Sequence, residues 1–143
     1  MRALVVDDSR AMRAIVARAL RKAGAKEITE AADGVEAVAY LEKVEQGGQL
    51  PDVALVDWNM PNMNGLELVK TVRRRPAWRR MAIMMVTTEN EPGQVVRALA
   101  AGAHEYLIKP FDESSLLDKL AILGLQPTLG QPPQPADHLP GGT

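Results

Sequence analysis

The sequence of 143 residues contains no cysteine, only two histidines, and aromatic residues at 3% of its positions. Without cysteine the chain can form neither disulfide bonds nor thiolate metal sites. Its apolar runs stay far below the ~18 residues of a membrane-spanning helix, and Asp7 and Asp8 follow the first run too early for a signal-peptide core. With 17 basic and 18 acidic residues, the net charge of -1 favours neither DNA nor a membrane as partner. We therefore expect a cytoplasmic protein.

The composition, with 46% hydrophobic and 24% charged residues, is that of an ordinary globular domain. We expect one folded domain over residues 1–125. The remaining segment, 126–143, holds five of the ten prolines and three glycines. Such a composition predicts a disordered tail, and one too short to form a DNA-binding output domain.

Short apolar runs of strand length alternate with longer segments of helical period. The five expected strands are 3–6, 26–31, 53–56, 81–86 and 105–108. Strands this continuously apolar are buried on both faces, which indicates a parallel sheet with helices on either side. We therefore expect an α/β fold with an open, doubly wound, five-stranded parallel sheet.

Helix signals fit between these strands. Either Ser9 or Asp8 can cap the first helix, while Asp33 and Asn64 precede the second and third. Apolar residues at helical spacing, including Ile15 in the first helix and Leu99 in the fourth, are expected to face the core.

Polar residues stand where four of the five strands end, namely Asp7 with Asp8, Asp57, Thr87 and Lys109. In an open parallel sheet the carboxyl ends of the strands form one rim, which is where such folds bind ligands. A single aspartate after a strand is usually a turn residue or a helix cap. Three carboxylates at one rim repel one another unless a cation lies among them, and hard oxygen ligands point to Mg²⁺.

Two other features carry less chemistry. The stretch 73–80, "RRRPAWRR", places five arginines around Trp78, and a solvated basic turn explains it more simply than a phosphate-binding patch. His104 and His138 have no neighbour at metal-ligand spacing, so both are expected to be surface residues.

Four stretches, "VVDDS", "VDWNMPNMNGLEL", "MMVTTEN" and "YLIKPF", together resemble the receiver domain of two-component response regulators. The resemblance covers about residues 2 to 124 and is closest to the single-domain chemotaxis response regulators (CheY-like). It implies a flavodoxin-like fold with strand order 2-1-3-4-5. It also implies a phosphoacceptor switch that catalyses its own phosphorylation and dephosphorylation and is not a conventional enzyme.

The resemblance assigns roles to the residues at the rim. Asp57 would be the phosphoacceptor, attacking a phosphohistidine to make an acyl phosphate. Asp8 would hold Mg²⁺ directly, Asp7 mainly through water, and Asn59 through its backbone carbonyl. Lys109 would neutralise the phosphoryl oxygens, and its bond to Pro110 resembles the family's cis peptide.

The resemblance also implies how the signal leaves the site. Thr87 would bond to the phosphoryl group and move toward it, and the ring of Tyr106 would then turn inward. Thr88 is larger than the residue many relatives carry there, which bears on how easily that ring turns. The predicted partner face, on the fourth helix, fifth strand and fifth helix, contains Asn90, Val95, Tyr106 and Lys119. Two further expectations concern the pocket around Asp57. Trp58 should lie at the rim of this pocket, and Asn59 and Glu89 should leave a path for water to reach it.

The implied partners are a sensor histidine kinase of the CheA type and a downstream target such as a flagellar switch component, acting on a monomer. A phosphorelay intermediate, or a regulator outside chemotaxis, remains an alternative. A haloacid-dehalogenase-type phosphatase would need a second aspartate two residues after Asp57, where this chain has Asn59. A flavodoxin-like cofactor binder would need a phosphate-cradling loop after the first strand, where "DDSR" would repel a phosphate.

Overall fold

The computed structural model describes residues 1–125. The predicted disordered tail, 126–143, lies outside the described residues, so that prediction stays untested.

The described residues form a five-stranded parallel sheet in the order β2-β1-β3-β4-β5. The strands are β1 (Arg2–Val6), β2 (Glu27–Ala31), β3 (Val53–Val56), β4 (Ala82–Thr87) and β5 (Glu105–Ile108). Both the predicted fold class and the strand order implied by the resemblance are therefore confirmed. Thr87 closes β4 instead of following it, a shift of one residue from the expected strand.

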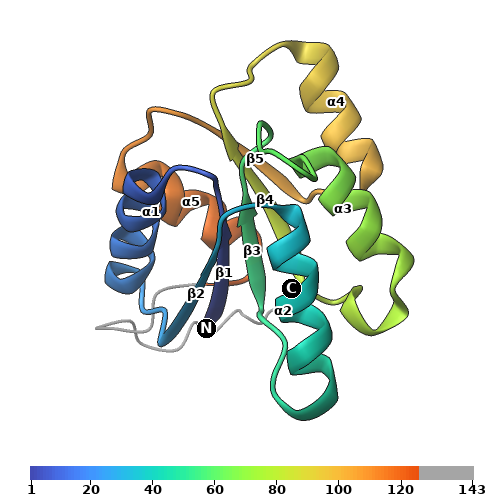
Figure 1. Ribbon diagram of the computed structural model, residues 1–143. Helices are drawn as coiled ribbons and strands as arrows, with labels where there is room; N and C mark the ends of the chain where they lie inside the picture. The colour runs from blue at the N-terminus through green and yellow to red at the C-terminus, as the bar shows by residue number, and fades with distance from the viewer. Residues whose placement is uncertain (126–143) are drawn as a thin grey trace, which may run out of the picture.

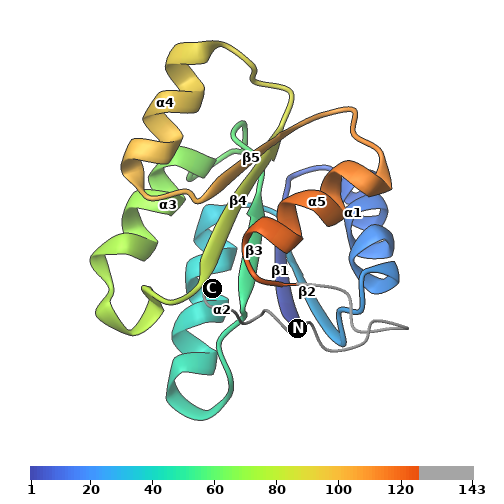
Figure 2. The ribbon, with the colours of Figure 1, turned by 180° about the vertical axis from the view of Figure 1, so that it is seen from behind.

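The helices cover the two faces of the sheet (Figure 1). They are α1 (Arg10–Lys22), α2 (Gly34–Gly47), α3 (Gly65–Arg74), α4 (Pro92–Ala101) and α5 (Glu113–Ile122). α1 and α5 lie on one face, and α2, α3 and α4 lie on the other, as both views show (Figure 2). Within residues 1–125, no helix combines the length and the apolar character needed to cross a membrane.

Side-chain caps fix where the helices begin. Ser9 Oγ accepts a hydrogen bond from the Met12 amide, so Ser9 and not Asp8 caps α1. Asp33 caps α2, and Asn64 forms a reciprocal capping box at the start of α3. The predicted caps of these helices are confirmed, and each fixes where the loop from the preceding strand ends.

The apolar core is divided by the sheet into two clusters, one under each helix layer. Several residues expected in it are exposed, among them Ile15, which is 54% accessible, and Leu99, which is 44% accessible. Among the residues of α4 only Ala98 is buried. Spacing identifies the apolar stripe of a helix but not how much of that stripe a neighbouring element covers, and here part of it is left uncovered.

The arginine-rich stretch is not a simple solvated turn. Trp78 lies in a short 3₁₀ helix, Pro76–Trp78, and is fully buried. Its indole N–H donates to Glu45 at 2.6 Å, and Arg75 stacks 4.4 Å above its ring while pairing with Glu42. The tryptophan therefore anchors this turn to α2, while Arg74, Arg79 and Arg80 are exposed, as a solvated basic turn predicts.

Candidate functional site

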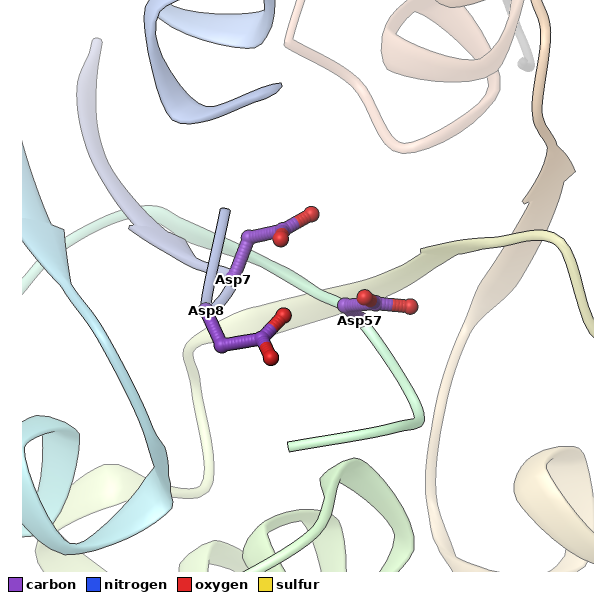
Figure 3. A group of neighbouring side chains, drawn as sticks. All are labelled: Asp7, Asp8 and Asp57. Carbon is purple, nitrogen blue, oxygen red and sulfur yellow. The ribbon is translucent and has the colours of Figure 1, made fainter. Parts of the chain in front are cut away.

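Three carboxylates meet at the carboxyl end of the sheet. Asp7, Asp8 and Asp57 each offer an oxygen within 4.8 Å of the others (Figure 3). They meet because β1 and β3 are paired neighbours whose last residues, Val6 and Val56, stand opposite each other. The residues that follow these two must therefore emerge side by side, as the sequence predicted.

The loop after β3 is shaped to present Asp57. Its carboxylate accepts a hydrogen bond from the Trp58 amide at 2.8 Å, which orients the side chain. The chain then returns so closely that a Cβ on Gly65 would stand 2.2 Å from the Asp57 carbonyl oxygen. Only glycine fits there, and its amide donates to the Trp58 carbonyl at 2.9 Å. The glycine of "MNG" therefore closes the turn beneath the acid.

Lys109 brings a positive charge into this cluster from the end of β5. Its Nζ lies 2.8 Å from Asp7 Oδ2 and 3.5 Å from Asp57 Oδ2. The peptide bond from Lys109 to Pro110 is cis, as the resemblance implied. Lys109 thus pairs with two of the three carboxylates, so when all three are ionised an excess of negative charge remains beside it.

Asp57 is the carboxylate whose ionisation this environment opposes. It is 9% exposed, and burial raises its pKa above the ordinary value. The nearby charge of Asp7 raises it further, while the Thr87 hydroxyl, the Lys109 ammonium and the Trp58 amide act in the opposite direction. A buried oxygen nucleophile beside a cation, in a cluster that favours a further cation, suits transfer of an anionic group.

The backbone of Glu89 links this cluster to the surface of β5. Its amide donates to Thr87 Oγ1 at 3.3 Å, and its carbonyl accepts from the Tyr106 hydroxyl at 2.6 Å. Tyr106 is 8% exposed, so the ring lies inward in this structure. Burial raises its pKa, as do the charges of Glu89 and Asp57. The sequence showed no sign of this link, because it runs through backbone atoms.

Two residues near the pocket differ from their expected places. The Asn59 side-chain amide donates to Glu89 Oε2 at 2.6 Å, so these two side chains are bonded to each other instead of standing apart. Trp58 was predicted at the rim, but the residue is only 7% exposed and belongs to the core. Its backbone amide, and not its ring, reaches Asp57. The expected metal contact of the Asn59 carbonyl stays a prediction.

The four residues predicted on the partner face share one groove. A hollow of about 380 Å³ between α4, β5 and α5 is lined by Asn90, Val95, Leu99, His104, Glu105, Tyr106, Ile108 and Lys119. Within it, Lys119 Nζ pairs with Glu105 Oε1 at 2.8 Å. The groove therefore combines apolar surface with an internally neutralised ion pair, and Tyr106 connects its floor to the carboxylate cluster.

Comparison with known proteins identifies close relatives. A family model for the response regulator receiver domain matches residues 3–121. A chemotaxis protein CheY homolog of Campylobacter jejuni is 47% identical over 125 residues, which cover 87% of this chain and 93% of the relative. Chemotaxis protein CheY1 of Helicobacter pylori is 42% identical over 123 residues, covering 86% and 96%. Among solved structures, chemotaxis protein CheY4 of Vibrio cholerae gives a TM-score of 0.76 at 39% identity, covering 85% of this chain and 97% of that one.

Proposed function

Because this chain belongs to the response regulator receiver family, we propose that it is a signalling switch that is set by phosphorylation of Asp57. The observation that carries the assignment is the position of this carboxylate. It lies buried at the end of β3, within 3.5 Å of Lys109 and in the same cluster as Asp7 and Asp8. A turn residue would need neither the burial nor the charged neighbours.

In the proposed reaction a carboxylate oxygen of Asp57 attacks the phosphorus of a phosphohistidine on a kinase. A P–O bond forms, the P–N bond breaks, and the imidazole leaves with the electron pair and takes up a proton from solvent. The Lys109 ammonium balances the charge of the phosphoryl oxygens, and the Thr87 hydroxyl donates a hydrogen bond to one of them. Attack of water on the phosphorus later breaks the bond to Asp57 and restores the carboxylate with release of phosphate.

The carboxylate cluster fits Mg²⁺. Its donors are hard oxygens, and the charge that remains beside Lys109 is negative. Asp8, Asp7 and Asp57 would hold the ion, together with the Asn59 carbonyl. When bound, the metal would add positive charge for the incoming phosphoryl oxygens.

The signal would leave the site through Glu89 and Tyr106. If Thr87 moves toward the phosphoryl group to donate its hydroxyl proton, its oxygen would move away from the Glu89 amide, from which it accepts at 3.3 Å. The carbonyl of Glu89 accepts a hydrogen bond from the Tyr106 hydroxyl. A shift of the Glu89 backbone would therefore move the tyrosine and reshape the groove. Partner binding on the face containing Asn90, Val95, Tyr106 and Lys119 would then report phosphorylation.

The relatives named as chemotaxis proteins support a role in chemotaxis. We accordingly propose a CheA-type histidine kinase as donor and a flagellar switch component as target, with residues 1–125 acting as a monomeric cytoplasmic receiver. A phosphorelay intermediate or a regulator outside chemotaxis is the alternative, and it would share the same site. An aspartyl-phosphate phosphatase is disfavoured, because Asn59 holds the position of its second acid and an amide cannot donate a proton as a carboxylic acid does.

Labelling with acetyl phosphate and Mg²⁺, read by intact mass, tests the assignment. The wild type should gain one phosphoryl group, and Asp57→Asn should gain none. Asp118→Asn, which changes an exposed aspartate of α5, is the matched control and should label like the wild type. Equal labelling of Asp57→Asn and the wild type would overturn the assignment.

A further inference from the structure

His104 fastens the start of β5 to β4 at two points. Its backbone amide donates to the Ile83 carbonyl at 2.8 Å, and its ring Nδ1 accepts from the Ile83 amide at 3.1 Å. β5 begins one residue later, at Glu105, so no strand residue is placed to accept from this amide. Ile83 is buried, and its N–H would lose its partner without the imidazole. The histidine side chain thus completes the hydrogen bonding of the sheet.

A second donor points at the same ring atom. Arg73 Nη2 lies 3.2 Å from His104 Nδ1, and the same guanidinium donates to the carbonyls of Gly102, Arg79 and Met81. With two N–H groups directed at it, Nδ1 must carry a lone pair. The imidazole is therefore neutral and carries its proton on Nε2.

The surroundings of the ring oppose a second proton. Of the described residues, Arg73 from α3 is the one charged group within hydrogen-bonding distance of the imidazole. Glu105 and Lys119, which line the same groove from β5 and α5, neutralise each other. A proton on Nδ1 would face the Ile83 amide and a permanent cation, so the ring would have to leave this position.

We propose that His104 is a pH-sensitive latch, which keeps the start of β5 and the adjoining groove in their binding conformation only while its imidazole is neutral. His104 itself lines the groove and stands two residues before Tyr106. Release of the latch therefore changes the surface on which Asn90, Val95 and Lys119 also lie. The effect on partner binding rests on the proposed function of that groove. The opening and closing of the latch does not depend on that function.

The direction of the pH dependence follows from the ring's environment. His104 is exposed as a residue, but partial burial of its ring against Ile83, and then the charge of Arg73, lower the pKa of His104 below its ordinary value of 6.5. The neutral form is thus favoured in the folded state. The latch is fully closed above about pH 6.5, and it opens as the pH falls through the lowered pKa.

NMR titration of the protein alone tests the latch. The His104 ring should titrate below 6.5, and the amide signals of Ile83, Tyr106 and Lys119 should shift with the same midpoint. Exchange of the Ile83 amide, corrected for its intrinsic rate, should become about tenfold faster between about pH 7 and pH 5, as expected when a buried donor loses its acceptor. His138 is the other histidine of the chain, and its ring signal is assigned separately with His138→Gln.

The matched variant is His104→Asn, whose amide oxygen can occupy the place of Nδ1 but does not titrate. It should keep the slow Ile83 exchange at both pH values. Three results would each overturn the latch. The His104 ring could titrate at or above 6.5, or the exchange of the Ile83 amide could fail to change with that titration. His104→Asn could also show the same pH response as the wild type. Because no partner is present, these results are independent of whether the groove binds one.

Discussion

The ammonium of Lys109 lies 2.8 Å from the carboxylate of Asp7, and both side chains are less than a tenth exposed. Its distance to Asp57 is longer, at 3.5 Å. The lysine therefore pairs more closely with Asp7 than with Asp57. A metal ion that uses Asp7 would compete with Lys109 for the carboxylate, and binding of the ion would leave the ammonium available to a phosphoryl group on Asp57.

Mg²⁺ should stabilise the folded protein, because the crowded carboxylates bind it only when the fold brings them together. A ligand at about ten times its Kd contributes about 1.4 kcal/mol to the free energy of unfolding. For a domain of this size, that raises the melting temperature by about 4 °C. Thermal melts with and without millimolar MgCl₂ at constant ionic strength measure the shift, and NaCl alone should not produce it. An unchanged midpoint would remove the case for a cation site.

Lys109→Met provides a sharper version of that measurement. In the absence of metal, this substitution leaves the nearly buried carboxylates without their cation. It should therefore lower the free energy of unfolding by about 3 kcal/mol. Since the competitor for Asp7 is then gone, the Mg²⁺ shift should be larger than in the wild type. Lys119→Met, which breaks the pair with Glu105 away from the cluster, should leave the Mg²⁺ shift unchanged.

Trp58 should report on the site by its fluorescence. Its ring is buried, with the Arg97 guanidinium 5.9 Å from the ring centre, and its backbone amide holds Asp57. Mg²⁺ or beryllofluoride should therefore change its emission through a movement of the loop. Trp78, bonded to Glu45 and distant in the fold, should stay constant. Trp58→Phe should lose the response and Trp78→Phe should keep it; the reverse pattern would show that the signal comes from elsewhere.

Much of the site could be predicted because parallel strands leave little freedom. Once Val6 and Val56 end adjacent strands, Asp7 and Asp57 have to meet. The apolar runs identified those strands, and the resemblance implied that they are neighbours. The capping residues Asp33 and Asn64 were predictable for a similar reason, since their side chains bond to amides only three residues away.

The contacts that could not be predicted depend on the choice of one partner among several. Lys109 could reach either Asp7 or Asp57, and in the structure it lies nearer to Asp7, at 2.8 Å against 3.5 Å. His104 was expected to be a plain surface residue, and it is exposed, yet one ring nitrogen replaces a missing strand partner of Ile83. The start of β5 at Glu105 was predicted, but the direction in which the preceding side chain turns, and hence its bond to the Ile83 amide, depends on the packing of β4 and α3 around it.

The phosphorylated state should be short-lived. Asn59 and Glu89 are both polar, and their mutual bond can open to admit water in line with the acyl phosphate. We expect loss of phosphate from the purified protein within minutes at neutral pH. Asn59→Met, which places an apolar side chain across that path, should slow the loss by about tenfold, equivalent to about 1.4 kcal/mol in the barrier. Release of phosphate after labelling measures both rates, and a wild-type lifetime of many hours would contradict the expectation.

Asp57→Asn should make the metal-free protein more stable at neutral pH, because the amide keeps the shape of the side chain and removes one of three crowded charges. The pKa of Asp57 is raised in the folded state, so its charge opposes folding once the pH exceeds that pKa. The gain in melting temperature should therefore be largest at neutral pH and should vanish as the pH falls below the pKa of the unfolded chain, about 4. Melts of the two proteins across this range measure the difference, with the exposed Asp118→Asn showing none. A variant that is less stable than the wild type at neutral pH would instead mean that the Asp57 charge holds the fold together through Lys109, and that its position at the rim is structural.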